Sequence, residues 1–404
     1  MWILSSIEDA LNSLLSALNE YSIAKEVNVL DSLHMFSAKK YFSKINLPQY
    51  PKATMDGYAV MSSDCSNASL NNPILLKVLS HVIKSGEKKD FSIKSGECLK
   101  IETGGFLPKN ADAVVPIEDV ILSGSYIEIT TTIGKYENVS LPGEELKEGD
   151  IIIGEGDIIR PWHVSTLYVS EYEKILVKKL TASIIYTGDE FNNTTLKPYT
   201  NYLVKGWLEE HGFTIDKIVH SKDDSSEVKN KVLELLGNHT FVIVLGGSSK
   251  GDYDTVFNGL QGISEKYVRG IRMKPGKTTS IYVIDGKPVV SISGLPAAAL
   301  SSLELIVRPL LSRWLKLKFS PLPRVKAILN RRVTSKLGYV SFTRVRVFWR
   351  DNKLYAEPLV GGGSGSLRSL VLGNGYIVIP EEDEGYDKGE VVEVVLYGSI
   401  KEDL

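Results

Sequence analysis

A chain of 404 residues is too long for one compact core and sufficient for two to four domains. The 47 basic and 49 acidic side chains give a net charge of −2, which argues against nucleic-acid binding through bulk positive charge. The two cysteines lack a paired or zinc-type spacing, and no apolar run reaches the roughly 18 residues of a membrane span. We therefore expect a cytoplasmic protein without a disulfide framework, a thiolate metal cluster or a membrane span.

The first expected element is a helix over residues 6–30. Apolar residues at helical spacing support it: Ile7, Leu11, Leu14, Leu15 and Leu18. Ser5 and Glu8 form the Ser-x-x-Glu pattern of a capping box, and no basic segment precedes the apolar residues. We therefore interpret this stretch as a helix and not as a signal peptide.

The next part of the chain predicts a small β domain. Residues 73–140 contain short β-type runs separated by turn residues, and no long helix fits there. A helix is then expected at 161–172, because Pro161 is favoured in a first helical turn.

From residue 180 onward, apolar strands alternate with amphipathic helices. The strands are expected in "ASIIY", "TIDKIVH" and "FVIVL", and the helices in "TNYLVKGWLEEHGF" and "SSEVKNKVLELLGN". A hairpin-like pair around Asp285-Gly286 and a long helix, "AAALSSLELIVRPLLSRWL", follow. This alternation predicts a multidomain α/β plus β protein with a doubly wound, mostly parallel sheet. After Lys318, short strands return and predict a second all-β domain.

Three loops are expected at one edge of this sheet, because ligands of doubly wound sheets bind beyond the carboxyl ends of the strands. They are Thr187 to Glu190, Gly246 to Asp254, and Ser293 to Ala299. Gly246 and Gly247 allow backbone N–H groups to approach an anion, and Pro296 marks a helix start that also favours an anion. The pattern indicates a phosphate site.

Carboxylates inside these loops indicate a divalent cation beside the phosphate. Mg²⁺ prefers one or two carboxylates together with phosphate oxygens, and Glu190, Asp252 and Asp254 are available. Two simpler interpretations stay open, in which Asp252 caps the next helix and Asp189 is a turn aspartate. Asp254 lies further along the chain and is harder to explain as a cap.

A basic turn near the same sheet offers cations to a polyanion. Gly276, Lys277 and Thr278 look like part of a Walker loop, but the upstream glycine would fall at Ile271 and no apolar strand leads into it. A P-loop is therefore rejected. Lys274 and Lys277 on a rigid Lys-Pro-Gly-Lys turn are predicted to bind a polyanion, with a plain solvated turn as the alternative.

Taken together, these motifs resemble the molybdopterin molybdenumtransferases, the bacterial and archaeal molybdenum insertases related to the C-terminal part of gephyrin. The matching segments, in family order, are "MDGYAV" (55–60), "IETGGFLPKNADAVVPIED" (101–119), "TGDE" (187–190), "GGSSKGDYD" (246–254), "KPGK" (274–277) and "SGLP" (293–296). The resemblance implies four domains: an elongated discontinuous first domain at 1–48 and 142–178, an inserted β domain at 49–141, an α/β pterin-binding domain at 179–317 and a C-terminal β barrel at 318–404.

The resemblance also implies a reaction, the insertion of molybdate or tungstate into adenylylated molybdopterin with release of AMP and assistance from Mg²⁺. Cleavage of a phosphoanhydride depends mainly on positioning and charge neutralisation, which an anion site supplies. The implied catalytic residues are Asp56, Glu190 and Asp254, of which Glu190 and Asp254 hold the metal. The implied substrate-binding residues are Thr103, Glu145, Thr187, Gly188, Gly246, Gly247, Ser249, Lys274, Lys277 and Pro296.

The resemblance further implies a homodimer whose cleft joins the α/β domain of one subunit to the first two domains of the other. Asp56 would then face the acidic loops across the subunit boundary. The simpler interpretation is that Asp56 caps its own turn and that Gly57 supplies a positive φ.

The chain departs from the family pattern in several places. It reads Gly-Leu-Pro-Ala-Ala-Ala at 294–299, where the family reads Gly-Leu-Pro-Gly-Asn-Pro, and Tyr199 and Glu145 each replace an aspartate. These departures favour a second hypothesis, a catalytically altered paralogue that binds a pterin nucleotide or an oxyanion as carrier or scaffold. A third is an unrelated nucleotide-handling enzyme with the same sheet. The retained acidic residues favour the transferase.

Overall fold

The computed structural model describes residues 3–87, 90–191, 196–247, 254–359 and 363–402. Its contacts divide the chain into two compact units, each described by itself. Unit 1 comprises 1–39, 155–160 and 174–404, and unit 2 comprises 40–154 and 161–173.

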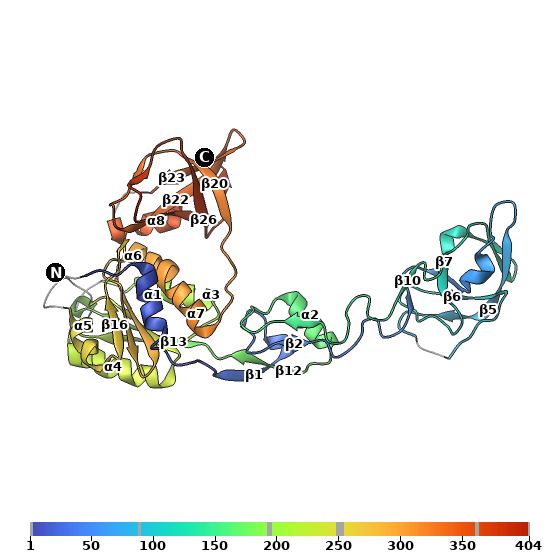
Figure 1. Cartoon of the computed structure of the whole chain (residues 1–404), viewed down its shortest axis with the longest axis horizontal. Coiled ribbons are helices and arrows are strands. Elements are labelled where there is room, and N and C mark those ends of the chain that lie inside the picture. Colours follow the sequence, from blue (N-terminus) through green and yellow to red (C-terminus); the bar gives the residue numbers. More distant parts are fainter. Residues whose placement is uncertain (1–2, 88–89, 192–195, 248–253, 360–362, 403–404) are drawn as a thin grey trace. The chain divides into compact units, whose positions relative to one another are not determined.

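A six-stranded mixed sheet forms the centre of unit 1 (Figure 1). Its order is β14-β13-β15-β19-β18-β16; the first four strands are parallel, and β18 is antiparallel to both β19 and β16. The predicted mostly parallel, doubly wound sheet is confirmed. The strands are β13 (Thr181–Thr187), β14 (Thr214–Ser221), β15 (Phe241–Leu245), β16 (Lys266–Arg269), β18 (Ser280–Ile284) and β19 (Lys287–Ile292).

The predicted hairpin joins β18 and β19 through Asp285 and Gly286. Both residues have positive φ values, 51° and 65°, which suit the tight Asp-Gly turn of a two-residue hairpin.

Helices cover both faces of the sheet (Figure 1). Neighbouring strand residues point to opposite sides, and both sides carry apolar side chains that need a helix to bury them. Ile184 and Ile243 belong to the core beneath α1, α3 and α7, whereas Ile185 and Val244 belong to the core beneath α4 and α5. The helices are α1 (Ile7–Leu15), α3 (Thr200–Glu210), α4 (Ser225–Asn238), α5 (Thr255–Leu260), α6 (Pro296–Ser302) and α7 (Arg308–Leu315).

α1 is much shorter than the sequence predicts. It ends at Leu15, and the chain then forms β1 (Ala24–Asn28), which pairs with β12 (Lys174–Lys178). The prediction of helix beyond residue 15 is wrong because a distant strand supplies hydrogen bonds that local periodicity does not reveal. The cap is also displaced by one residue, since the hydroxyl of Ser6 accepts from the N–H of Asp9 at 3.1 Å.

α1 packs against α7 near the end of the α/β region. Leu11 and Leu14 of α1 share one core with Leu310 and Leu311 of α7. Arg313 adds a bidentate ion pair to Glu8 at 2.9 and 3.0 Å. The two helices are therefore held by apolar contact and by charge.

The C-terminal region of unit 1 is a closed five-stranded barrel, as predicted. β22 pairs with β23, and the ring continues through β20, β26 and β24 back to β22. Short strands β17 (Met273–Lys274) and β27 (Lys401–Glu402) lie beside β22. The barrel strands are β20 (Arg324–Leu329), β22 (Val340–Arg350), β23 (Lys353–Pro358), β24 (Gly375–Ile379) and β26 (Val391–Leu396), with α8 (Leu367–Leu372) between β23 and β24.

Unit 2 contains the predicted inserted β domain, a six-stranded sheet in the order β7-β4-β6-β5-β9-β8. α2 (Pro161–Val169) begins at the predicted proline and ends three residues early. The strands are β2 (Tyr41–Phe42), β3 (Lys52–Ala53), β4 (Gly57–Val60), β5 (Ile74–Ile83), β6 (Glu97–Ile101), β7 (Ala113–Pro116), β8 (Val120–Ser123), β9 (Tyr126–Ile129), β10 (Val139–Ser140) and β11 (Ile151–Ile153).

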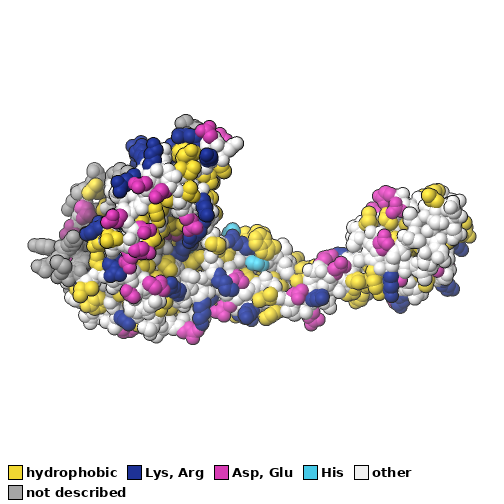
Figure 2. Space-filling model, turned by 45° about the horizontal axis from the view of Figure 1, so that its top comes forward, with side chains coloured by type: hydrophobic (Ala, Val, Ile, Leu, Met, Phe, Trp, Pro, Cys, Tyr) yellow, Lys and Arg dark blue, Asp and Glu magenta, His cyan; other side chains and the backbone are white. Residues whose placement is uncertain are grey.

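On the face shown in Figure 2, acidic and basic side chains are interspersed over both units. None of the helices in the described part of the chain has the length and apolar character needed to cross a bilayer.

Candidate functional site

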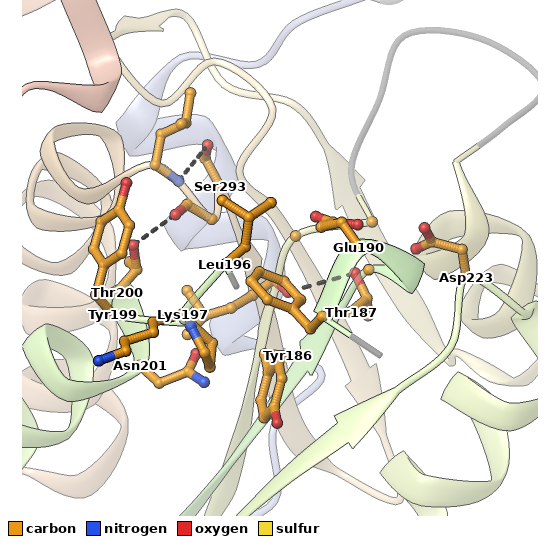
Figure 3. A pocket seen from close by; sticks show the side chains of 18 of the residues that line it. Tyr186, Thr187, Glu190, Leu196, Lys197, Tyr199, Thr200, Asn201, Asp223 and Ser293 are labelled. Carbon is orange, nitrogen blue, oxygen red and sulfur yellow. Dashed lines mark hydrogen bonds between the residues drawn. The ribbon is translucent and has the colours of Figure 1, made fainter. Parts of the chain in front are cut away.

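A pocket of about 690 Å³ lies at the carboxyl edge of the parallel strands (Figure 3). Thr187 pairs with Ser221, and Leu245 with Ile292, so four parallel strands end side by side. The chain runs from β13 outward to β14 and then returns past β13 to β15, so the sheet changes direction between β13 and β15. Such a switch point is where doubly wound sheets bind ligands.

The three loops predicted from the sequence meet in this pocket. Each parallel strand that precedes one of them delivers the start of its loop to the same edge. The lining residues from these loops are Thr187, Gly188 and Glu190, then Gly246, Gly247 and Thr255, then Ser293, Gly294 and Leu295.

The second loop leaves no room for side chains where it lines the pocket. Gly246 and Gly247 have φ values of 87° and 63°. A Cβ at Gly247 would stand 2.7 Å from the Val256 side chain and 2.8 Å from the hydroxyl of Thr187. Glycine is therefore required here for its positive φ and for the close approach of neighbouring groups.

Glu190 is the acidic side chain of the first loop. It is exposed, lines the pocket and folds over Gly188, because a Cβ at that glycine would lie 2.5 Å from the Glu190 carboxylate oxygens. Asp223, which follows β14, also lines the pocket (Figure 3). The backbone N–H groups of Asp189 and Asp223 donate to each other's carboxylates at 3.4 Å, which fits the interpretation of Asp189 as a turn residue.

Asp254 is buried and does not line the pocket among the described residues. Its carboxylate caps α5 by accepting from the N–H of Phe257 at 3.0 Å, and it forms an ion pair with Arg269, also at 3.0 Å. Burial raises the pKa of Asp254, while the Phe257 N–H and the Arg269 guanidinium act in the opposite direction. The expectation that Asp254 is not a cap is wrong, because α5 begins directly after it. Asp252 lies outside the described residues.

The basic turn lies against α6 rather than in the lining of this pocket. Pro275 accepts a hydrogen bond from the Ser301 hydroxyl at 2.8 Å, and Gly276 has a φ of 104°. Lys274 is exposed, with its ammonium 5.0 Å from the centroid of the Tyr339 ring, and Lys277 is half-buried. The turn is thus fixed by contacts of its backbone, and its lysines keep their side chains at the surface or near it.

Pro296 is the first residue of α6, as predicted, and it is buried. Leu295, rather than Pro296, is among the described residues that line the pocket. The three alanines that follow Pro296, 297–299, are all buried. The altered third loop therefore still leads into an ordinary helix. Ser249 lies outside the described residues.

The predicted residues of unit 2 form two separate contacts. One Asp56 carboxylate oxygen accepts from the N–H and the hydroxyl of Thr103, at 2.7 and 2.8 Å, and these bonds lower the pKa of Asp56. Glu145 forms an ion pair with Lys52 at 2.6 Å. The simpler interpretation required a positive φ at Gly57, and Gly57 does not have one. It is needed instead because a Cβ there would stand 2.1 Å from the carbonyl oxygen of Val115.

The donor set of the pocket is compatible with a magnesium ion that keeps most of its ligands from water and phosphate. No three His, Cys, Asp or Glu side chains converge on a metal position within the described ranges. Mg²⁺ beside phosphate needs only one or two protein carboxylates, and Glu190 and Asp223 are the carboxylates among the described lining residues. The Asp254 carboxylate, in contrast, forms an ion pair with Arg269 in this arrangement.

Sequence reasoning missed Asp223 as a site residue. It also named only Tyr199, as a departure from the family pattern, from the segment that precedes and opens α3, residues 196–201, which lines the pocket as well. The signal for Asp223 was available, since it follows a parallel strand and must lie at the same edge. The signal for residues 196–201 was weaker, because the length of a loop does not reveal where the next helix begins.

The fold and pocket define a multidomain α/β protein with a ligand pocket at the switch point of its doubly wound sheet. Residues 183–313 match the family model described as a probable molybdopterin binding domain. Residues 5–169 match the MoeA N-terminal region (domains I and II), and residues 326–397 match the MoeA C-terminal region (domain IV). The chain belongs to the MoeA family.

Individual relatives agree with this assignment along nearly the whole chain. A putative molybdopterin biosynthesis protein of Methanocaldococcus jannaschii is 34% identical over 94% of both chains. A molybdopterin molybdenumtransferase of Staphylococcus aureus (strain COL) is 28% identical over 90% of this chain and 89% of its own. The crystal structure of the molybdopterin biosynthesis moeA protein from Pyrococcus horikoshii OT3 superposes with a TM-score of 0.84 at 26% identity, covering 98% of this chain and all of that one.

Proposed function

We propose that this chain is a molybdopterin molybdenumtransferase. It inserts molybdate or tungstate at the dithiolene of adenylylated molybdopterin and releases AMP. The observation that carries the proposal is the glycine-lined pocket at the switch point of the sheet, where the backbone of Gly246 and Gly247 lies too close to Thr187 for either residue to carry a side chain. The relatives named as molybdenumtransferases support the same reaction.

The pocket lining suits the two kinds of group in such a substrate. The positive φ values of Gly246 and Gly247 give the loop a backbone conformation in which N–H groups can approach phosphate oxygens. Elsewhere in the lining, Tyr186, Phe191, Leu196 and Leu295 contribute apolar surface. Apolar walls exclude water, and hydrogen bonds and charges act more strongly in such surroundings.

The charged residues divide between the oxyanions and a magnesium ion. Glu190 is the carboxylate best placed to hold Mg²⁺, with Asp223 beside it. When bound, the ion neutralises charge on the phosphoanhydride that is cleaved. Lys274 and Lys277 supply positive charge for molybdate or pyrophosphate, since phosphate-binding lysines act as point charges.

The proposal includes a homodimer, and unit 2 offers a surface for it. Apolar side chains are exposed on the elements around α2: Phe42, Ile151, Trp162, Tyr168 and Val169. Large exposed apolar patches mark interaction sites, and a second copy of the chain would cover this one. Mixing inactive Asp56→Ala and Glu190→Ala variants should restore up to about a quarter of wild-type activity if the two residues act across the dimer, because half the dimers are mixed and each holds one intact site.

The direct test is AMP release by the purified protein from adenylylated molybdopterin, with Mg²⁺ and either oxyanion. Omitting the oxyanion is the control, and AMP release should require it. A pterin that copurifies tightly without turnover would favour the alternative of a carrier or scaffold. Absence of both turnover and pterin binding would contradict both readings.

A further inference from the structure

Two side chains at the start of α3 line the pocket and have no partner within the described residues. The Asn201 side-chain amide is part of a residue only 3% exposed, yet it makes no hydrogen bond with the described part of the chain. The amide atoms are not among the described side-chain atoms that are sealed from solvent without a partner, so they reach the solvent in the pocket. The amide can therefore exchange water there for a ligand group that donates and accepts hydrogen bonds.

Tyr199 offers an unpaired aromatic ring in the same place. It directly precedes the first residue of α3 and already has helical backbone angles, with φ −67° and ψ −24°. The residue is 45% exposed and lines the pocket, and its ring contacts no other described ring or charged group. The ring is therefore available to stack on a planar ligand group.

Thr200, between these two residues, fixes their position. It is buried, and its hydroxyl donates to the carbonyl oxygen of Gly294 at 2.6 Å. The start of α3 is therefore tied to the third loop of the pocket. Figure 3 shows Tyr199 and Thr200 at one end of the pocket and Glu190 and Asp223 at the other.

We propose that Tyr199 and Asn201 form a subsite for a planar heteroaromatic ring, which stacks on Tyr199 and presents its polar edge to the Asn201 amide. Aromatic side chains stack on such rings whatever their substituents, and an asparagine amide offers a donor and an acceptor side by side. Adenine and pterin share this chemistry. The inference rests on the proposed function, in which the substrate carries both rings with phosphate between them.

The test compares ligands with and without a ring, using calorimetry on the full-length protein. AMP is paired with ribose 5-phosphate, and neopterin monophosphate with glycerol phosphate. Tyr199→Leu should weaken the ring-bearing ligand about tenfold and leave its ringless counterpart unchanged. Tyr199→Phe keeps the ring and should bind as the wild type does. Tyr202→Leu is the matched control, since Tyr202 is exposed on the same helix and does not line the pocket.

The two arms identify which ring is bound. Loss confined to AMP assigns the subsite to adenine, and loss confined to neopterin monophosphate assigns it to pterin. Asn201→Leu should reduce affinity for the same ligand, and its unfolding midpoint must match that of the wild type. Equal binding of all four ligands by Tyr199→Leu and wild type would overturn the inference, as would a wild type that binds neither ring-bearing ligand.

The inference and the proposed function can fail separately. If the wild type releases no AMP from adenylylated molybdopterin but Tyr199→Leu loses ring binding, the ring subsite stands and the transfer reaction falls. If the wild type releases AMP and Tyr199→Leu binds every ligand normally, the subsite falls and the transfer reaction stands.

Discussion

The ion pair between Asp254 and Arg269 allows a direct test of whether Asp254 holds a helix in place or ligates a metal. Asp254→Asn keeps an oxygen that can accept from the Phe257 N–H, and asparagine caps helices as well as aspartate does. The substitution removes the charge from the 3.0 Å contact with Arg269. It therefore isolates the ion pair from the cap.

The expected cost follows from the burial of the two partners. Removing one partner from a fully buried pair costs about 3–5 kcal/mol. The Asp254 side chain is 3% exposed but that of Arg269 is 21% exposed, and the guanidinium stays 3.6 Å above the Phe257 ring. Water and the Phe257 ring still stabilise the Arg269 guanidinium when its partner charge is removed. We therefore expect Asp254→Asn to lower the stability of this region by about 2 kcal/mol, the value typical of a hydrogen bond to a charged group. Asp254→Ala should cost about 1 kcal/mol more through loss of the cap.

Amide hydrogen exchange of α5 measures this cost in the full-length protein, because opening of the helix exposes the Phe257 N–H. A cost of about 2 kcal/mol corresponds to roughly 30-fold faster exchange. Asp224→Asn is the matched control, since Asp224 caps α4 through the Glu227 N–H without a charged partner among the described residues. Unchanged exchange in Asp254→Asn, together with a higher Mg²⁺ requirement for AMP release, would refute the reasoning and make Asp254 a metal ligand.

Three further predictions concern the glycine loop, the unit 2 carboxylate and the basic turn. Gly247→Ala should reduce AMP affinity at least about tenfold because the new Cβ meets neighbouring side chains, whereas Gly124→Ala, at a similar φ of 60° in open space, should leave it unchanged. Because the pKa of Asp56 is lowered, its contribution to stability is present above the ordinary pKa of 3.8 and is lost as pH falls through the lowered value. In an NMR titration, Thr103→Val should move the pKa of Asp56 partway back up, because the variant removes the hydroxyl donor and keeps the backbone N–H donor. An unmoved pKa would contradict this assignment. Lys277→Ala should weaken AMP binding in calorimetry, and the difference in affinity from the wild type should shrink at high salt. If the variant binds AMP as tightly as the wild type at every salt concentration, the basic turn is a plain solvated turn.

The fold was largely predictable because its strands are buried on both faces. Adjacent residues such as Ile184 and Ile185 belong to different cores, so β13 and β15 appear in the sequence as continuous apolar runs. The overlong first helix shows the limit of this reasoning. β1 is stabilised by β12, about 150 residues away, and no local pattern contains that information.

The pocket was predictable where it depends on topology and not where it depends on loop geometry. Strand-end loops must meet at one edge of a parallel sheet, which places Thr187, Gly246 and Ser293 together. The orientation of Asp254 could not be predicted, because its partner comes from β16 and the start of α5 is set by the length of the loop. The positions of the Tyr199 and Asn201 side chains in the pocket lining could not be predicted either, because they depend on where α3 begins.

The packing of α1 on α7 has a consequence for the order of events during synthesis. Glu8 and its partner Arg313 are 305 residues apart in the chain. At about 5–20 residues per second, a ribosome needs roughly 15–60 s to complete the segment between them. Throughout that interval the apolar face of α1, including Leu11 and Leu14, has no partner helix. Residues 40–154 of unit 2 are completed during the first half of the interval. The nascent chain therefore carries an exposed amphipathic segment that chaperones can bind, and the α/β domain closes only after nearly four-fifths of the protein has been made.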